Sequence, residues 1–169
     1  MDRDQLRTVQ QPLKERYRRE PETALVTLAA AGTLGEGISC SVDTGRALAE
    51  AGLHRASGGD GSLLCSGDML LEALVACAGV TMRAVATSLG ISVHGAVRAE
   101  GDLDFRGTLG VDREAPVGFS GIRLTFELDE AVDNEQLDRL LGLTERYCVV
   151  YQTLISSTPI WTTISEPGA

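Results

Sequence analysis

The sequence predicts an α+β fold in which antiparallel sheets pack on two long central helices. Residues 66–90 and about 133–155 carry apolar residues at spacings of three and four, which is typical of helices with one buried face. The other segments alternate apolar and polar residues or form short apolar runs bounded by glycine, which indicates strands. The order of strands, helix, strands, helix and strand therefore favours helices laid on a sheet.

The length and charge of the chain limit the classes of protein to which it can belong. The chain has 169 residues, 43% of them hydrophobic, which suits one domain with its own core. Its formal net charge of −9 argues against a nucleic acid or an anionic membrane as partner. The charged start is no secretory signal, and no apolar run approaches the roughly 20 residues of a membrane span. We therefore expect a cytoplasmic protein with reduced cysteines.

The N-terminal part is predicted to differ from the rest. Residues 3–20 form a short polar helix that Pro12 is expected to weaken or split. We assign residues 1–22 to an N-terminal helical extension and residues 23–169 to a single domain. Glycine-rich turns then separate three predicted strands, at residues 24–33, 37–44 and 46–54.

The first long helix, residues 66–90, carries Cys77 in the middle of its apolar face. Ser66 and Asp68 are good start signals, and Gly90 is a good stop signal. Small residues surround Cys77, which allows another backbone to come close. The predicted buried stripe consists of Leu70, Leu74, Cys77, Thr81, Val85 and Leu89.

The second long helix, about residues 133–155, repeats this arrangement around Cys148. If the two helices pack side by side, the sulfurs of Cys77 and Cys148 can meet. The alternation of apolar and polar residues predicts three antiparallel strands between the helices, at residues 91–101, 102–112 and 118–129, and a closing strand at residues 158–166. The stripe of the second helix consists of Leu137, Leu141, Thr144, Cys148, Tyr151 and Ile155.

The other two cysteines, Cys40 and Cys65, are most simply small structural residues. No two cysteines form a CxxC pair, so their spacing does not favour a zinc site. We expect no metal and no other cofactor.

Two motifs point to a known family. SGDMLLEALVACAGVT resembles the helix signature of the OsmC/Ohr family (osmotically induced protein C and organic hydroperoxide resistance protein), in which an acidic residue precedes a run of Leu and Ala that ends in AC. TERYCVVYQTL resembles the second signature of that family, in which YC is followed by valine and a polar turn. The resemblance covers residues from about 24 to 165. It implies an OsmC-like fold and an intertwined homodimer in which both subunits line each pocket.

The resemblance also implies a thiol peroxidase that acts in oxidative-stress defence. Cys77 would attack an organic hydroperoxide, alkyl or lipid, and become a sulfenic acid. Cys148 would then condense with it to a disulfide, which an external dithiol reductant reduces. The alternative is a protein of the same fold that binds a small apolar or thiol-reactive ligand in the dimer-interface pocket without turnover.

A cysteine nucleophile needs a lowered pKa, because only the thiolate attacks and a free thiol has a pKa of about 8.5. Cys77 lies several turns inside its helix, so the positive end of that helix is too far away to help. We therefore expect a cation, held by an acidic partner, beside the sulfur.

The resemblance assigns these two roles to an arginine from the preceding strands and an acid just before the helix. Asp68 takes the place of the acid, although it also suits a simple helix cap. Arg55 takes the place of the arginine, with Arg46 in reserve, and a plain surface arginine is equally consistent. An arginine at hydrogen-bond distance from the Cys77 sulfur would favour the enzyme, and a cation-free pocket would favour the binding protein.

Overall fold

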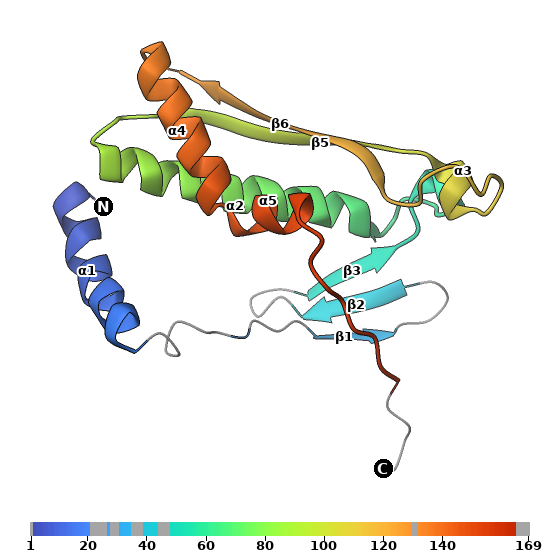
Figure 1. Cartoon of the computed structure of the whole chain (residues 1–169). Helices are drawn as coiled ribbons and strands as arrows, with labels where there is room; N and C mark the ends of the chain where they lie inside the picture. Colours follow the sequence, from blue (N-terminus) through green and yellow to red (C-terminus); the bar gives the residue numbers. More distant parts are fainter. Residues whose placement is uncertain are drawn as a thin grey trace.

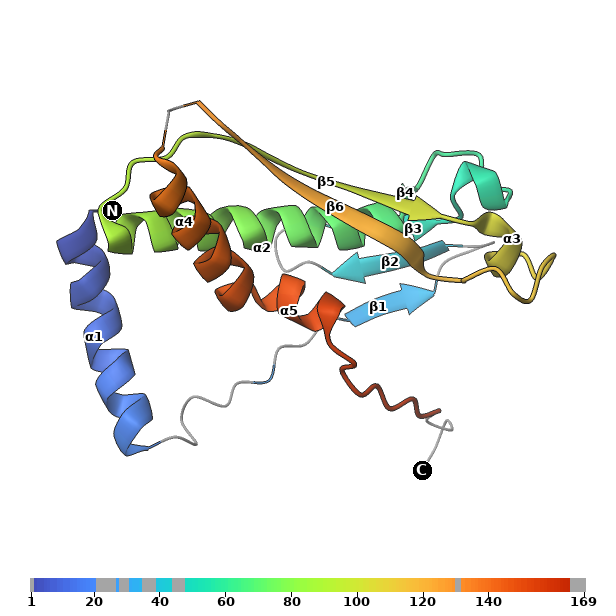
Figure 2. The same ribbon diagram turned by 45° about the horizontal axis from the view of Figure 1, so that its top comes forward.

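A computed structural model describes residues 2–20, 27, 31–34, 39–43, 48–129 and 132–164. The fold is α+β, as predicted, and it is arranged around one long helix, α2 (Ser66–Leu89). The two-stranded ribbon of β5 (Gly95–Leu103) and β6 (Phe119–Leu128) runs along one side of α2, and α4 (Asn134–Tyr147) crosses it (Figures 1 and 2). This arrangement places the middle of α2 at the centre of the molecule.

Helix α2 has the limits that its sequence predicts. It ends where Gly90 adopts a left-handed conformation (φ 73°), and the Gly90 amide caps the last carbonyls of the helix. Cys65 is the N-cap residue and makes no side-chain cap bond, so neither Ser66 nor Asp68 acts as the cap. Asp68 lies instead in the first turn, where a carboxylate interacts favourably with the helix dipole.

The length and apolar composition of α2 would also suit a membrane span, with a mean hydropathy of 1.7. The expectation that no segment approaches such a span is therefore wrong for this helix. Core helices of globular proteins pass the same test, because they too are long and apolar. Here α2 packs against β5, α4 and α5 (Val149–Ile155), and these elements bury 28% of the apolar span in the single chain.

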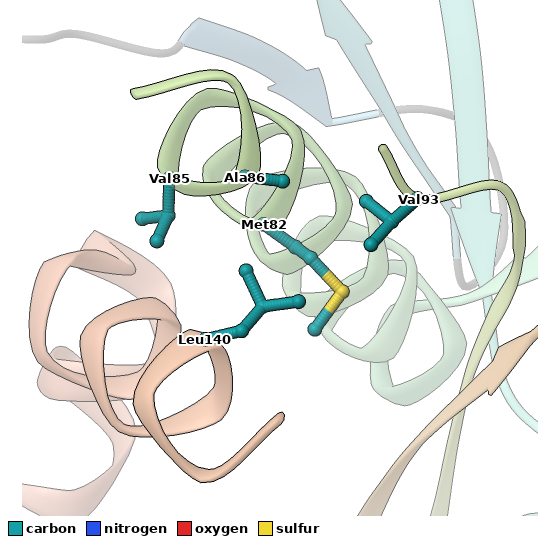
Figure 3. Packing of buried hydrophobic residues seen from close by; sticks show 5 residues of the cluster. All are labelled: Met82, Val85, Ala86, Val93 and Leu140. Carbon is teal, nitrogen blue, oxygen red and sulfur yellow. The ribbon is translucent and has the colours of Figure 1, made fainter. Parts of the chain in front are cut away.

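The core between α2 and α4 is centred on Leu140, which is fully buried. Figure 3 shows Leu140 pointing from α4 toward Met82, Val85 and Ala86 of α2, with Val93 closing the cluster. The buried row of α2 is therefore rotated from the predicted stripe, because the helix is covered from two sides, by the sheet and by α4. Its buried residues are Leu74, Ala78, Met82, Val85 and Ala86.

The prediction of one continuous second helix is wrong. The chain forms α4 and α5 as separate helices, and Cys148 between them has an extended backbone (φ −74°, ψ 109°). Asp133 caps the start of α4 by accepting a hydrogen bond from the Gln136 amide at 2.9 Å. No glycine or proline marks the break, and only the weak helix propensity of Val149 and Val150 accompanies it.

The N-terminal strands form a separate four-stranded sheet near the N-terminal half of α2 (Figure 1). The first three strands pair antiparallel, whereas the last pair is parallel and joins the sheet to the start of α2. Most of the strand predicted at residues 24–33 lies outside the described residues. The strands are β1 (Ala31–Leu34), β2 (Ser39–Asp43), β3 (Leu48–Gly52) and β4 (Leu64–Cys65).

The ribbon of β5 and β6 contains two of the three strands predicted after Gly90. The strand predicted at residues 102–112 is wrong, because β5 ends at Leu103 and the short helix α3 (Phe105–Thr108) follows. Asp104 caps α3 and also pairs with Arg106, which favours a turn at this point over an extended chain.

The predicted closing strand is also wrong for the residues that the structure describes. Residues 158–164 form no strand, and their large apolar side chains are at least 85% exposed. Alternating apolar residues indicate a face that needs cover, but a strand also needs a neighbour with which to pair. This segment leaves the body of the molecule after α5 (Figure 2).

The predicted N-terminal helix is present as α1 (Arg3–Arg19), and Pro12 lies inside it without splitting it. α1 contacts α2 and shares a cavity with Ser88 near the end of that helix. The predicted division into an extension, residues 1–22, and one domain, residues 23–169, stays a prediction.

Candidate functional site

The structure brings Cys77 and Cys148 together. Cys77 lies half-buried in the middle of α2, and Cys148 lies 1% exposed at the break between α4 and α5. Both are free thiols, and they are hydrogen-bonded to each other. Leu74 and Ala78 pack against Cys148, so small and apolar side chains let the two helices approach at this point.

The break before α5 supplies backbone donors to Cys77. Partial burial raises the pKa of the Cys77 thiol, but hydrogen bonds from the amides of Val150 and Val149, from the Cys148 thiol and from the Thr81 hydroxyl outweigh it. The pKa of Cys77 therefore lies below its usual range. Since these donors stabilise the thiolate, the arrangement favours ionisation of this sulfur.

For Cys148, the effects that raise the pKa of the thiol outweigh those that lower it. Burial raises the pKa of its thiol, and the neighbouring Cys77 raises it further, although the amides of Tyr151 and Val150 offset part of the effect. When two thiols interact this closely, the first proton leaves the pair at a lower pH than the second. Cys77 is therefore the member of the pair that becomes the thiolate first.

No cation of the described residues contributes to the lowered pKa of Cys77. Within the described ranges, the groups that lower it are amides, a thiol and a hydroxyl, and no arginine is among them. Sequence reasoning missed Val149 and Val150 because a backbone amide carries no sequence signature. The two valines directly after Cys148 were the one available signal, and it was a weak one.

Arg55 lies in the short 3-10 helix η2 (Arg55–Ser57), in the loop before β4. A Cβ atom built on Gly61 would lie 2.2 Å from Arg55 Nε, so the guanidinium packs directly over this glycine. His54 stacks on Phe105 of α3 with ring centroids 5.0 Å apart, which ties η2 to α3. The structure therefore holds Arg55 against its own loop.

Asp68 precedes Cys77 by nine residues on the same helix, which is about 13.5 Å along the axis. Its carboxylate is therefore too far away to touch the Cys77 sulfur. No ion pair joins Asp68 to Arg55 in the part of the chain that the structure describes, and Arg46 lies outside that part. The roles of all three residues stay predictions.

The two remaining cysteines lie apart from this pair in the chain. Cys65 is half-buried at the start of α2 with a free thiol, and Cys40 lies in β2, where only the backbone is described. Among the described residues, no group of three or more His, Cys, Asp or Glu side chains gathers as metal ligands.

A cavity of about 540 Å³ lies between α2, β6 and the two last helices, and neither Cys77 nor Cys148 is part of its lining. Leu74 and Tyr151 line it and also pack against Cys148. Burial raises the pKa of Tyr151, and the Glu145 carboxylate beside the phenol raises it further, so the hydroxyl stays protonated at neutral pH. The lining residues are Leu74, Phe119, Ile122, Leu124, Phe126, Leu141, Glu145, Tyr151, Leu154 and Ile155.

Large apolar side chains near the cysteines are exposed. Val80, one turn after Cys77, is 72% exposed, and Val149, next to Cys148, is 68% exposed. Exposed apolar side chains that form one contiguous patch mark a surface that contacts a partner or a ligand.

Comparisons with known proteins agree on the fold. The family model described as "OsmC-like protein" matches residues 59–163. An OsmC-like protein from Mycoplasma pneumoniae has a similar structure, with a TM-score of 0.62 at 16% identity over 76% of this chain and 87% of that chain. No curated protein matches the sequence significantly.

Two further solved structures carry functional names. An organic hydroperoxide resistance protein OsmC from Legionella pneumophila matches with a TM-score of 0.61 at 18% identity, over 78% of this chain and 90% of that chain. The organic hydroperoxide resistance protein OhrB of Bacillus subtilis matches with a TM-score of 0.58 at 16% identity, over 78% of this chain and 93% of that chain. At these identities the similarity shows the fold.

Proposed function

The chain belongs to the OsmC-like protein family, and from this premise we propose that it is a cysteine-based thiol peroxidase that reduces organic hydroperoxides. The names of its structural neighbours, which refer to organic hydroperoxide resistance, support a redox role in peroxide defence. The observation that carries the proposal is the contact between two thiols of unequal acidity, Cys77 and Cys148.

In the proposed reaction, the Cys77 thiolate attacks the terminal oxygen of the hydroperoxide. The O–O bond breaks, an S–O bond forms, and the alkoxide takes up a proton and leaves as an alcohol. The Cys148 thiol then attacks the sulfur of the sulfenic acid, water leaves, and the disulfide forms. A dithiol reductant supplies the two electrons that restore both thiols.

The different environments of the two sulfurs support this division of roles. A nucleophile has to be ionised and reachable, and Cys77 is both more acidic and more exposed than Cys148. A resolving thiol has only to lie within reach of the sulfenic acid that forms, and the hydrogen bond between the two thiols meets that condition.

The cavity lined by Leu74 and Tyr151 supports an organic substrate. Its wall is formed by side chains from four elements of the fold, and all of them except Glu145 are aliphatic or aromatic. Each CH₂ group that such a wall removes from water contributes about 0.8 kcal/mol, so an alkyl or aryl hydroperoxide gains binding energy that hydrogen peroxide lacks.

We also propose that the protein works as a homodimer in the cytoplasm. Val80 and Val149 leave an apolar surface beside the cysteines, and the segment after α5 exposes Ile160, Trp161 and Ile164. A second copy of the chain would cover these side chains and complete the wall of the pocket.

The alternative is a protein of the same fold that binds a small apolar or thiol-reactive ligand without turnover. It is favoured by one observation: the groups that act on Cys77 within the described residues include no arginine. Since amides can stabilise a thiolate without a cation, the peroxidase remains the better-supported proposal. The two proposals differ in turnover, because a binding protein would react or bind once and would not consume further peroxide with a dithiol present.

A titration of thiols tests the proposal directly. The reduced protein is treated with one equivalent of an alkyl hydroperoxide, free thiols are counted before and after, and mass spectrometry locates any disulfide. We expect the loss of two thiols per chain and a disulfide between Cys77 and Cys148. Unchanged thiols, or oxidation at Cys65 alone, would contradict the peroxidase.

A further inference from the structure

The break between α4 and α5 redirects three backbone amides. In a continuous α-helix, the amides of residues 149, 150 and 151 would donate to the carbonyls four residues earlier. Here the amides of Val149 and Val150 donate to the Cys77 sulfur, and those of Val150 and Tyr151 donate to the Cys148 sulfur. The helix resumes at once, because the Gln152 amide donates to the Cys148 carbonyl at 2.9 Å.

This redirection would leave the last carbonyls of α4 without their helical donors. In an unbroken helix the Val149 amide would donate to the Glu145 carbonyl. In this structure the Glu145 carbonyl has another donor. Gln152 Nε2 donates to it at 2.9 Å, from seven residues further along the chain. A side-chain amide thus stands where the Val149 amide would stand in an unbroken helix.

We propose that Gln152 is a positioning residue, whose side-chain amide holds the Glu145 carbonyl and so keeps the Val149 amide directed at the Cys77 sulfur. Without that donor, the Glu145 carbonyl regains the Val149 amide by continuing α4 for one more residue. A helix that gains a bond in this way withdraws the donor from Cys77, because one N–H cannot serve both acceptors at full strength.

The chemistry of this position explains why glutamine is suited to it. Its amide is an uncharged donor on a side chain long enough to cross one helical turn, so it satisfies a carbonyl without placing a charge near the thiols. Gln152 is exposed, so the need for a core residue does not account for its place. The inference rests on the proposed function for the role of Cys77, but its test requires no peroxide turnover.

The test compares two exposed, nearly isosteric substitutions on α5. Gln152→Met keeps the length of the side chain and removes the donor. Thr153→Val is the matched control, because it removes a side-chain bond to the Val149 carbonyl (2.8 Å) and leaves the Glu145 carbonyl untouched. Neither substitution changes Tyr151, which packs against Cys148, or Glu145, which interacts with the Tyr151 phenol.

The measurement is the rate of alkylation of Cys77 by iodoacetamide as a function of pH, on the reduced full-length chain and resolved by peptide mass spectrometry. In Gln152→Met the profile should move to higher pH, and the rate below the midpoint should fall about three- to tenfold, which corresponds to a pKa shift of about 0.5 to 1. Thr153→Val should match the unsubstituted protein. A profile for Gln152→Met that coincides with both would overturn the proposal.

A second readout begins with the unsubstituted protein, so its first part does not depend on how well a variant folds. In the unsubstituted protein, the NMR shift of the Val149 amide proton should follow the ionisation of Cys77, because a thiolate is a stronger acceptor than a thiol. In Gln152→Met this response should shrink. A Val149 amide that does not respond to Cys77 in the unsubstituted protein would exclude the proposed arrangement, whether or not the protein is a peroxidase.

Discussion

The Cys77 sulfur accepts a hydrogen bond from the backbone amide of Val150, although these residues lie on different helices and far apart in the sequence. The N–H groups at the start of α5 therefore reach the Cys77 sulfur. The N–H groups at the start of α2, the helix that carries Cys77, are too far away to do so. The thiolate of Cys77 is stabilised by backbone groups that only the fold brings to it, and this has consequences for pH dependence.

The first prediction concerns the pH profile of the two thiols. Because hydrogen bonds from backbone amides lower the pKa of Cys77, its alkylation should reach half of the maximal rate below the pH of about 8.5 that an ordinary cysteine requires. Burial raises the pKa of Cys148, so its alkylation should rise only at a higher pH. Peptide-resolved alkylation across the pH range measures both midpoints, and midpoints in the reverse order would contradict the assignment of Cys77 as the nucleophile.

The second prediction separates the roles of the cysteines. Cys77→Ser should abolish peroxide consumption, because a serine hydroxyl is too weakly acidic to supply the nucleophile. Cys148→Ser should consume about one equivalent and stop at the sulfenic acid, which excess peroxide oxidises further. Peroxide consumption and the mass of the oxidised protein distinguish these outcomes. If both variants lost the first turnover completely, the mechanism would have to be abandoned.

The sequence predicts the bounds of α2 well, because the signals for them lie within the helix and next to it. The period of its apolar residues and the stop at Gly90 need no knowledge of the rest of the fold, and the observed helix ends before that glycine. Which side of the helix is buried depends on what covers it. Two covers, the sheet and α4, turn the buried row toward Ala78 and Met82 and away from Leu70, which is 38% exposed.

The sequence does not predict the break at Cys148. A helix often ends at glycine or proline, and neither residue occurs between Thr144 and Gln152. The weak helix propensity of Val149 and Val150 is the local signal that accompanies the break. The break is favoured by contacts that exist only in the folded chain, since the freed amides find the two sulfurs as acceptors. The same limit explains why a cation was expected: side chains can be sought in a sequence, and backbone donors cannot.

The third prediction concerns the stability of the core. Leu140 is fully buried against α2, so Leu140→Ala should lower the free energy of unfolding by about 2–5 kcal/mol. Leu109→Ala is the matched control, because Leu109 is 55% exposed and its truncation should change stability by no more than about 0.5 kcal/mol. Urea unfolding followed by circular dichroism gives both values. Equal effects would mean that Leu140 does not lie at the centre of the core.

The fourth prediction concerns assembly. We expect an obligate dimer with an interface above the roughly 1,600 Å² of a standard complex, because one chain leaves Val80 and the segment after α5 exposed. Light scattering at micromolar concentration should give about twice the monomer mass of 17.9 kDa. A mass of one chain would contradict the prediction.

The single tryptophan offers an independent measure of the same event. Trp161 is 85% exposed on one chain, so a partner that covers it should shift its fluorescence emission to shorter wavelength. Trp161→Glu should weaken association, because it places a charge in an apolar contact. Emission typical of a water-exposed indole in the intact protein would show that this segment stays outside any interface.

The last prediction concerns selectivity among peroxides. Leu154 lies half-buried on the wall of the cavity and packs in the cluster around Cys148, so it is placed to contact the organic part of a substrate. We expect a higher kcat/KM for cumene hydroperoxide than for hydrogen peroxide, since only the former has apolar surface to bury. Leu154→Asn keeps the branching of the side chain and makes the wall polar, and it should lower this ratio about five- to tenfold while leaving the rate with hydrogen peroxide nearly unchanged. Thr153→Val, on the exposed side of the same helix, is the control and should keep the ratio. Comparable rates with both peroxides in the unsubstituted protein would show that the wall does not select its substrate.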